Sequence, residues 1–109
     1  MKILHIEDEP LIRKLVKAYL KDHEVVSVSN GRDAMLYCDG ADIVICDYNL
    51  GDDLFGDEIV KRIRVTSTVP IIAMSSDFFG VKKMCDNGAN FALGKPVNME
   101  VLADVLSRM

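Results

Sequence analysis

The segment 43–47 constrains the fold of this chain more than any other stretch. Its four consecutive apolar residues, Ile43 to Cys46, end at an acid, Asp47. An apolar run without alternation indicates a strand that is covered on both faces, as in a parallel sheet. Asp47 is therefore predicted to lie at the carboxyl end of a central strand, where ligands and chemistry collect in open α/β sheets. The loop that follows contains Gly51, Asp52, Asp53 and Gly56.

Short apolar runs and helical patterns alternate along the rest of the chain. We expect strands near 3–6, 24–29, 43–47, 71–74 and 89–93, and helices near 10–22, 34–38, 57–64 and 79–87, with a last helix capped by Asn98. Strands that alternate with helices through short connections form a doubly wound parallel sheet. The predicted fold is an α/β sheet of about five strands with helices on both faces, and residues 1–109 are expected to form a single domain.

Side-chain patterns add two details to this fold. The strand near 24–29 has one wetter side and is predicted at an edge of the sheet. In the first helix we expect the following residues to face the core: Leu11, Ile12, Leu15, Val16 and Tyr19.

Charge and composition limit the class of partner. The net charge is −4 at pH 7, and the basic residues are scattered instead of gathered in one stripe. We therefore expect no direct nucleic-acid binding and no membrane insertion, and favour a basic or protein partner. Acids at Glu7 and Asp8 come too early for a secretory signal, and the three cysteines are not spaced like metal ligands. These features predict a cytoplasmic protein with reduced cysteines.

Polar residues follow four of the predicted strands. The first strand ends at Glu7 and Asp8, the third at Asp47, the fourth at Ser75 and the fifth at Lys95. One acid at a strand end is more often a turn former or helix cap, and a single Ser or Lys is ordinarily a surface residue. Their joint appearance at successive strand ends favours a functional site.

A metal-binding and phosphoryl-transfer site is expected if the first and third strands are neighbours. Three carboxylates then converge, and their repulsion raises each other's pKa unless a cation relieves it. Oxygen ligands of this kind suit Mg²⁺. One carboxylate could then attack phosphorus as a nucleophile, while the Lys95 ammonium and the Ser75 hydroxyl hold the phosphoryl oxygens.

In its order of motifs the chain resembles a response-regulator receiver domain of two-component signalling, over essentially its whole length. The matching motifs are Glu7-Asp8, Asp47, Ser75-Ser76 and Lys95-Pro96, each after its strand. The resemblance implies a flavodoxin-like strand order 2-1-3-4-5, as in chemotaxis regulators of this family.

The resemblance also implies roles for individual residues. Asp47 corresponds to the phosphoacceptor, with Lys95 contacting the phosphoryl group and Ser75 supplying the hydroxyl that moves toward it. Magnesium is expected to be held by Asp8 and Asp47, by Glu7 through water and by the backbone carbonyl of Asn49. No other cofactor is expected. The phosphoryl donor is expected to be a histidine kinase or a histidine phosphotransfer protein, and the chain catalyses only its own phosphorylation and dephosphorylation.

The chain departs from the family pattern on its fifth strand. The family's switch aromatic usually lies three residues before the lysine, where this chain has Ala92, with Phe91 one position earlier. A shift of one residue turns the side chain to the other face of the sheet. Phe91 is therefore predicted to point into the core.

Several functions remain as alternatives. We expect a stand-alone switch, because Met1 begins almost at the first strand and no effector follows the last helix. The alternatives in the signalling class are a phosphorylation-independent interaction module and the receiver part of a longer regulator or hybrid kinase. An electron carrier would need a phosphate-cradling loop where the chain has Glu7 and Asp8, and a phosphatase would need an acid at Asn49.

Overall fold

The computed structural model describes residues 1–51 and 54–109, in which strands and helices alternate. The strands are β1 (Lys2–Ile6), β2 (Glu24–Val28), β3 (Ile43–Asp47), β4 (Ile71–Ser75) and β5 (Phe91–Gly94). The helices are α1 (Pro10–Tyr19), α2 (Gly31–Tyr37), α3 (Gly56–Thr66), α4 (Phe78–Asp86) and α5 (Met99–Ser107). Asp52 and Asp53, which the sequence places in the loop after Asp47, lie outside the described residues. None of these helices has both the length and the apolar character needed to cross a membrane.

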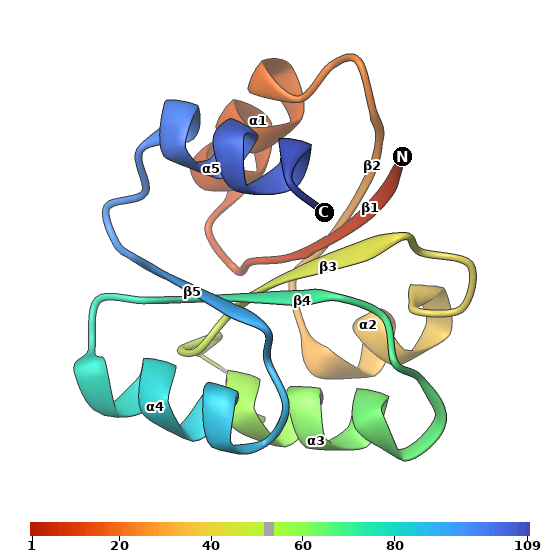
Figure 1. Cartoon of the computed structure of the whole chain (residues 1–109), viewed down its shortest axis with the longest axis vertical. Coiled ribbons are helices and arrows are strands. Elements are labelled where there is room, and N and C mark those ends of the chain that lie inside the picture. The colour runs from red at the N-terminus through yellow and green to blue at the C-terminus, as the bar shows by residue number, and fades with distance from the viewer. Residues whose placement is uncertain (52–53) are drawn as a thin grey trace.

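The strands form one parallel sheet in the order β2-β1-β3-β4-β5. This confirms the predicted α/β fold, its strand order and the edge position of the strand near 24–29. Helices α1 and α5 cover one face of the sheet, and α2, α3 and α4 cover the other (Figure 1).

The position of β3 in the middle of the sheet explains why its sequence does not alternate between apolar and polar residues. All five of its residues are buried. Ile43 and Ile45 pack in the core beneath α1 and α5, whereas Val44 and Cys46 pack in the core shared with α2, α3 and α4. A strand covered on both faces places apolar residues at every position, so the uninterrupted run 43–46 follows from its place in the middle of the sheet.

The prediction for the inward face of the first helix is partly wrong: Ile12 and Val16 face the core as expected, but Leu11, Leu15 and Tyr19 do not. Leu11, Leu15 and Tyr19 are 66%, 48% and 48% exposed, and the stripe toward the core is Ile12, Val16 and then Leu20. Both sets are spaced four residues apart, so periodicity alone fits either one. Because α1 shares its face of the sheet with α5, only a narrow stripe of α1 is covered.

The prediction that Phe91 enters the core is also wrong. The strand near 89–93 is β5, which runs from Phe91 to Gly94 at the edge of the sheet. Phe91 pairs with Ile72 and therefore lies on the α1 and α5 side, but its side chain is 41% exposed. An edge strand has a neighbour on one side only, which leaves its outer side chains partly in solvent.

A single arginine joins three segments at the end of the sheet opposite Asp47. The Arg64 guanidinium donates hydrogen bonds to the backbone carbonyls of Ser67 (3.2 Å), Val69 (2.7 Å) and Gly88 (3.0 Å) and to Oδ1 of Asn90 (2.9 Å). It thereby ties the end of α3 to the connections that enter β4 and β5.

We predict that Arg64→Met lowers the free energy of unfolding by about 2 kcal/mol, because hydrogen bonds from a charged donor are worth about 1.5–3 kcal/mol each and water replaces part of the loss at a half-exposed site. The matched control is Arg62→Met, whose guanidinium has only a 3.5 Å pair with Glu58 and should change stability by less than about 0.5 kcal/mol. Urea unfolding measures both. Equal effects of the two substitutions would contradict the role given to Arg64.

Candidate functional site

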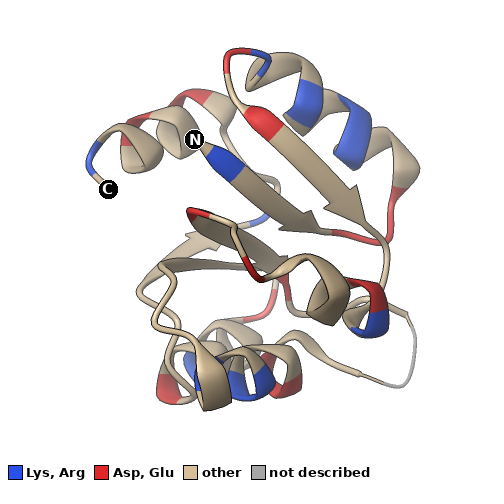
Figure 2. Ribbon diagram, turned by 90° about the vertical axis from the view of Figure 1, so that its right-hand side faces the viewer, with Lys and Arg blue, Asp and Glu red and all other residues tan. Residues whose placement is uncertain are grey.

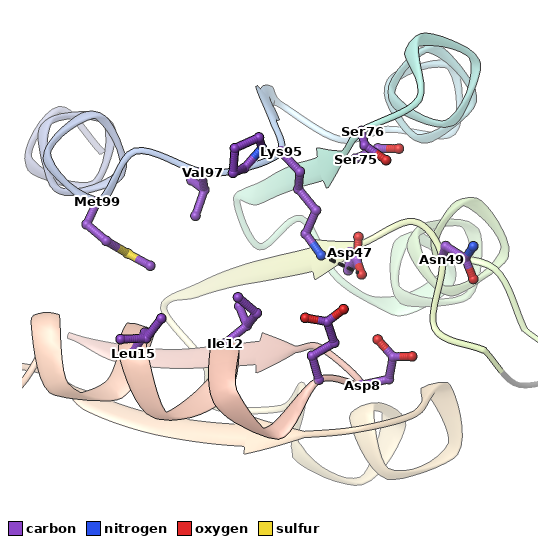
Figure 3. A pocket seen from close by; sticks show the side chains of 12 residues that line it. Asp8, Ile12, Leu15, Asp47, Asn49, Ser75, Ser76, Lys95, Val97 and Met99 are labelled. Carbon is purple, nitrogen blue, oxygen red and sulfur yellow. Dashed lines mark hydrogen bonds and ion pairs between the residues drawn. The ribbon is translucent and has the colours of Figure 1, made fainter.

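The polar residues predicted at the strand ends lie together at one edge of the sheet. Glu7 directly follows β1, Asp47 ends β3, Ser75 ends β4 and Lys95 directly follows β5. The parallel register aligns these positions, since Ile6 pairs with Cys46, Asp47 with Met74, and Ser75 with Gly94. Figure 3 shows Asp8, Asp47, Ser75 and Lys95 around the same opening.

Lys95 forms ion pairs with two carboxylates at once. Its Nζ lies 2.8 Å from Oε1 of Glu7 and 2.9 Å from Oδ2 of Asp47. The Glu7 side chain is fully buried and that of Asp47 is 6% exposed, while the lysine side chain keeps 21% of its surface in solvent. One ammonium group thus serves as counter-ion to an acid that follows β1 and an acid that ends β3. Figure 3 shows Lys95 reaching from the β5 side to Asp47.

The site holds more negative than positive charge. Carboxylate oxygens of Glu7, Asp8 and Asp47 all lie within 4.8 Å of one another. Burial raises the pKa of Glu7 to about 7, with the charge of Asp47 adding to the rise and the bond from Lys95 opposing it. Burial by itself lowers the pKa of Lys95, but its hydrogen bonds to Glu7 and Asp47 outweigh this and raise it, so the lysine stays charged.

These three carboxylates fit a divalent cation. Their donors are all oxygen, they are close enough to share one ion, and Asp8 is partly open to solvent. Hard oxygen ligands with room for retained water suit Mg²⁺ better than a soft metal. The Asn49 side chain accepts a hydrogen bond from the Gly51 N–H at 3.2 Å, and the part of its backbone carbonyl in metal binding stays a prediction.

Ser75 lies between the acidic site and helix α4. Its Oγ is buried and accepts a hydrogen bond from the Asp77 N–H at 2.9 Å. Gly80 in α4 packs so closely here that a Cβ on it would come within 2.6 Å of the Tyr48 ring and 2.9 Å of Ser75 Oγ. Ser75 and Tyr48 therefore leave no room for a side chain at this position in the first turn of α4.

The sequence reasoning missed this contact between Gly80, Tyr48 and Ser75. The one available signal was a glycine inside a helical pattern, which usually has a packing reason but does not name the partner. Tyr48 follows Asp47 directly and gave no signal of its own.

The acidic site continues into an apolar groove. One cavity of about 620 Å³ is lined at one end by Asp8, Asp47, Ser75 and Lys95, and at its other end by apolar side chains from α1 and from the connection between β5 and α5. The apolar residues shown in Figure 3 are Ile12, Leu15, Val97 and Met99. The sequence did not predict this extension, because it depends on which face of α1 stays exposed.

The arrangement suits transfer of an anionic group to Asp47. A carboxylate in this position can act as a nucleophile, and Lys95 lines the same cavity and can bind an anion beside it. Ser75 lines the same cavity, and its hydroxyl can donate a hydrogen bond to an anion bound there.

Comparison with known sequences identifies relatives of this chain. The family model described as the response regulator receiver domain matches residues 3–107. A cyclic di-GMP phosphodiesterase of Thermotoga maritima is 30% identical over an alignment of 107 residues, and the match covers 94% of this chain and 29% of that protein. The chain thus spans less than a third of the length of this curated relative.

Solved structures share the fold. A two-component response regulator from Clostridium difficile superposes with a TM-score of 0.91 at 24% identity, over 99% of this chain and 93% of that one. The chemotaxis response regulator CheY4 of Vibrio cholerae superposes with a TM-score of 0.87 at 31% identity, over 98% of this chain and 96% of that one.

The raised pKa of Glu7 predicts how stability changes with pH. In the unfolded chain Glu7 loses its proton near 4.5, but in the folded, metal-free protein only near 7. Its contribution to stability is therefore full below about pH 4.5 and is lost as the pH rises through about 7, by roughly 3 kcal/mol.

Glu7→Gln should remove this loss, so the variant gains stability over the wild type at about pH 8 but not at about pH 4. Thermal unfolding without divalent metal measures the difference. The matched control, Glu24→Gln, changes an exposed acid at the start of β2 and should leave the wild-type pH profile unchanged. Parallel profiles of the wild type and Glu7→Gln would show this explanation to be wrong.

Proposed function

The chain belongs to the response regulator receiver domain family, and from this we propose that it is a signalling switch that accepts a phosphoryl group on Asp47. Receiver domains of two-component response regulators act in general as phosphorylation switches. The observation that carries the assignment to Asp47 is its hydrogen bond with Lys95, inside a cluster of three carboxylates at the mouth of the cavity. An interaction module that works without phosphorylation has no need of this network.

In the proposed reaction a carboxylate oxygen of Asp47 attacks the phosphorus of a phosphohistidine or a small acyl phosphate. A phosphorus–oxygen bond to Asp47 forms, the bond to the donor breaks, and the leaving imidazole or carboxylate keeps the electron pair. Asp8, Asp47 and the Asn49 carbonyl, with Glu7 acting through water, would hold Mg²⁺, whose charge would neutralise that of the acids and of the incoming group. Lys95 and Ser75 then bond to the phosphoryl oxygens.

We propose that the donor is a histidine kinase or a histidine phosphotransfer protein that docks along α1. Leu11 and Leu15 are exposed there, and Leu15 also lines the apolar end of the cavity that contains Asp47. A donor helix lying on this stripe would bury apolar surface and bring its phosphohistidine to the acidic end.

We further propose that residues 1–109 are one receiver domain, acting in the cytoplasm and catalysing only its own phosphorylation and dephosphorylation. A second candidate is the receiver part of a longer regulator. It is favoured by the relative from Thermotoga maritima, of which this chain covers 29%. Both candidates share the same chemistry at Asp47.

The proposal predicts that the protein incubated with acetyl phosphate and Mg²⁺ gains one phosphoryl group, measured by intact-mass spectrometry. Removal of the metal with a chelator should abolish the adduct, because the uncompensated carboxylates repel the donor. Asp47→Ala should abolish it as well.

The matched control is Asp42→Ala, which removes an aspartate from the connection that enters the amino end of the same strand. Asp42 accepts a hydrogen bond from the Lys2 N–H there, far from the cavity. This variant should still gain the adduct. An adduct on Asp47→Ala would refute the assignment of the acceptor.

The edge strand makes one feature of the switch specific to this chain. Ala92 lies on the α4 side of β5, where it lines a cavity of about 300 Å³ together with Ser75, Phe78 and Val81. Phe91 lies on the other face, on the side of α1 and α5. The ring that the family carries beside this serine is therefore replaced by open space.

We predict that activation changes the surroundings of Phe78 and Phe79 but not of Phe91. Movement of the Ser75 hydroxyl acts on the start of α4, whereas pleating keeps Phe91 on the opposite face of the sheet. Fluorine NMR of fluorophenylalanine-labelled protein, with and without beryllofluoride, measures this. A Phe91 signal that shifts as much as those of Phe78 and Phe79 would speak against the prediction.

A further inference from the structure

All four phenylalanines of this chain lie at the surface. Phe55, Phe78, Phe79 and Phe91 are 47%, 77%, 70% and 41% exposed. An aromatic side chain gains much from burial, and exposed aromatic residues are enriched in protein interfaces. Their exposure therefore indicates that something other than this domain's own core makes use of them.

Three of these phenylalanines and Tyr48 form two aromatic pairs at the amino-terminal ends of α3 and α4. The Phe55 ring stacks on Tyr48 with their centroids 5.2 Å apart, and the Tyr48 ring packs against Gly80. Phe79 directly precedes Gly80, and its ring meets that of Phe78 edge-on at 6.4 Å. We call Tyr48, Phe55, Phe78 and Phe79 the aromatic patch. It lies at the amino-terminal ends of α3 and α4, which run side by side on one face of the sheet (Figure 1).

The end of the molecule that carries the aromatic patch is acidic. Asp57 and Glu58 occupy the first turn of α3, and Asp77 caps α4. The segments 7–9, 47–51, 54–58 and 75–79 contain no lysine or arginine. Lys95 lies beside them and forms ion pairs with Glu7 and Asp47. The acids in these segments are Glu7, Asp8, Glu9, Asp47, Asp57, Glu58 and Asp77.

The other basic residues also lie outside these segments; α3 and α4 carry theirs, Lys61, Arg62, Arg64, Lys82 and Lys83, beyond their first turns. Figure 2 shows the acidic segment directly after β1 and the basic bands along α1, which carries Arg13, Lys14 and Lys17. An apolar surface with an acidic border complements a partner that is basic and apolar. The acidic end of a second copy of this chain is repelled, and an anionic membrane is repelled in the same way.

We infer that the aromatic patch is the docking surface for a basic segment of a partner protein, in which lysine or arginine residues alternate with large apolar ones. The apolar anchors of the partner pack on the exposed rings of Phe55, Phe78 and Phe79. Its arginine or lysine residues lie over an exposed ring face or pair with Asp57 and Asp77. This surface is formed by α3 and α4, whereas the apolar groove beside Asp47 is formed by α1 and the connection to α5.

The aromatic patch is physically joined to the acidic site. Tyr48 follows Asp47 in the chain, and Gly80 touches both the Tyr48 ring and Ser75 Oγ. The next step rests on the proposed function: a phosphoryl group on Asp47 adds negative charge next to the patch and draws Ser75 away from Gly80. Both changes favour a basic partner, so docking should strengthen on phosphorylation.

The test uses the whole protein labelled with ¹⁵N and a short synthetic peptide of lysine, arginine and leucine. Amide shifts should change at the aromatic patch and at Gly80. A peptide with glutamate in place of the basic residues, and one with serine in place of leucine, should bind at least about tenfold more weakly. Shift changes centred on α1 or on the edge of β5 instead would overturn the inference.

The variant Phe78→Ser combined with Phe79→Ser should weaken peptide binding about tenfold without loss of fold, because both rings are mostly in solvent and the Asp77 cap is kept. The matched control is Phe91→Ser, which removes an exposed ring outside the patch and should change affinity less than about twofold. Equal losses in the two variants would overturn the inference.

The coupling is tested in samples treated with acetyl phosphate and Mg²⁺ and checked by intact mass. Phosphorylated protein should bind the basic peptide at least about threefold more tightly than unmodified protein. Unchanged affinity in a fully phosphorylated sample would overturn the coupling and leave the proposed function intact. Absence of any phosphoryl adduct would count against the proposed function instead, and docking to unmodified protein would still test the patch.

Discussion

The ammonium group of Lys95 holds two buried carboxylates, those of Glu7 and Asp47, where β1 and β3 end. Both acids would repel each other without it, and removing one member of a buried ion pair typically costs about 3–5 kcal/mol. The strand order makes this bond possible, because it places β1 beside β3 and brings β5 to the same edge of the sheet. The rest of the site, including the position of Asp8 and the path of the cavity, follows from this arrangement.

The apolar core offsets the loss of stability that the buried charges of this site cause. Every residue of β3 and β4 is buried, and both cores continue to the strand ends that carry Asp47 and Ser75. Sites of this kind keep unfavourable charge because function requires it, and neutral substitutions in them commonly stabilise a protein. The raised pKa of Glu7 has the same origin, since burial disfavours its charged form and the negative charge of Asp47 adds to this.

Much of the fold and the members of the site could be predicted from the sequence, because strand ends carry their own chemistry. An apolar run that stops at Asp47, and similar stops at Glu7, Ser75 and Lys95, fix which side chains meet once the sheet is parallel. Which side chains of the helices face the core, and which residues they pack against, could not be predicted. The stripes through Leu11 and Ile12 have the same period, and only the place of α5 decides between them.

The exposure of Phe91 and the contact of Gly80 with Tyr48 likewise depend on tertiary neighbours. The proposed switch requires that Lys95 bind the phosphoryl group once Asp47 carries it. A crystal structure of the protein with Mg²⁺ and beryllofluoride tests it most directly. We predict beryllofluoride on the Asp47 carboxylate, with Lys95 Nζ within hydrogen-bonding distance of a fluoride. Beryllofluoride on another acid, or Lys95 still bonded to Glu7 and Asp47 alone, would contradict the account.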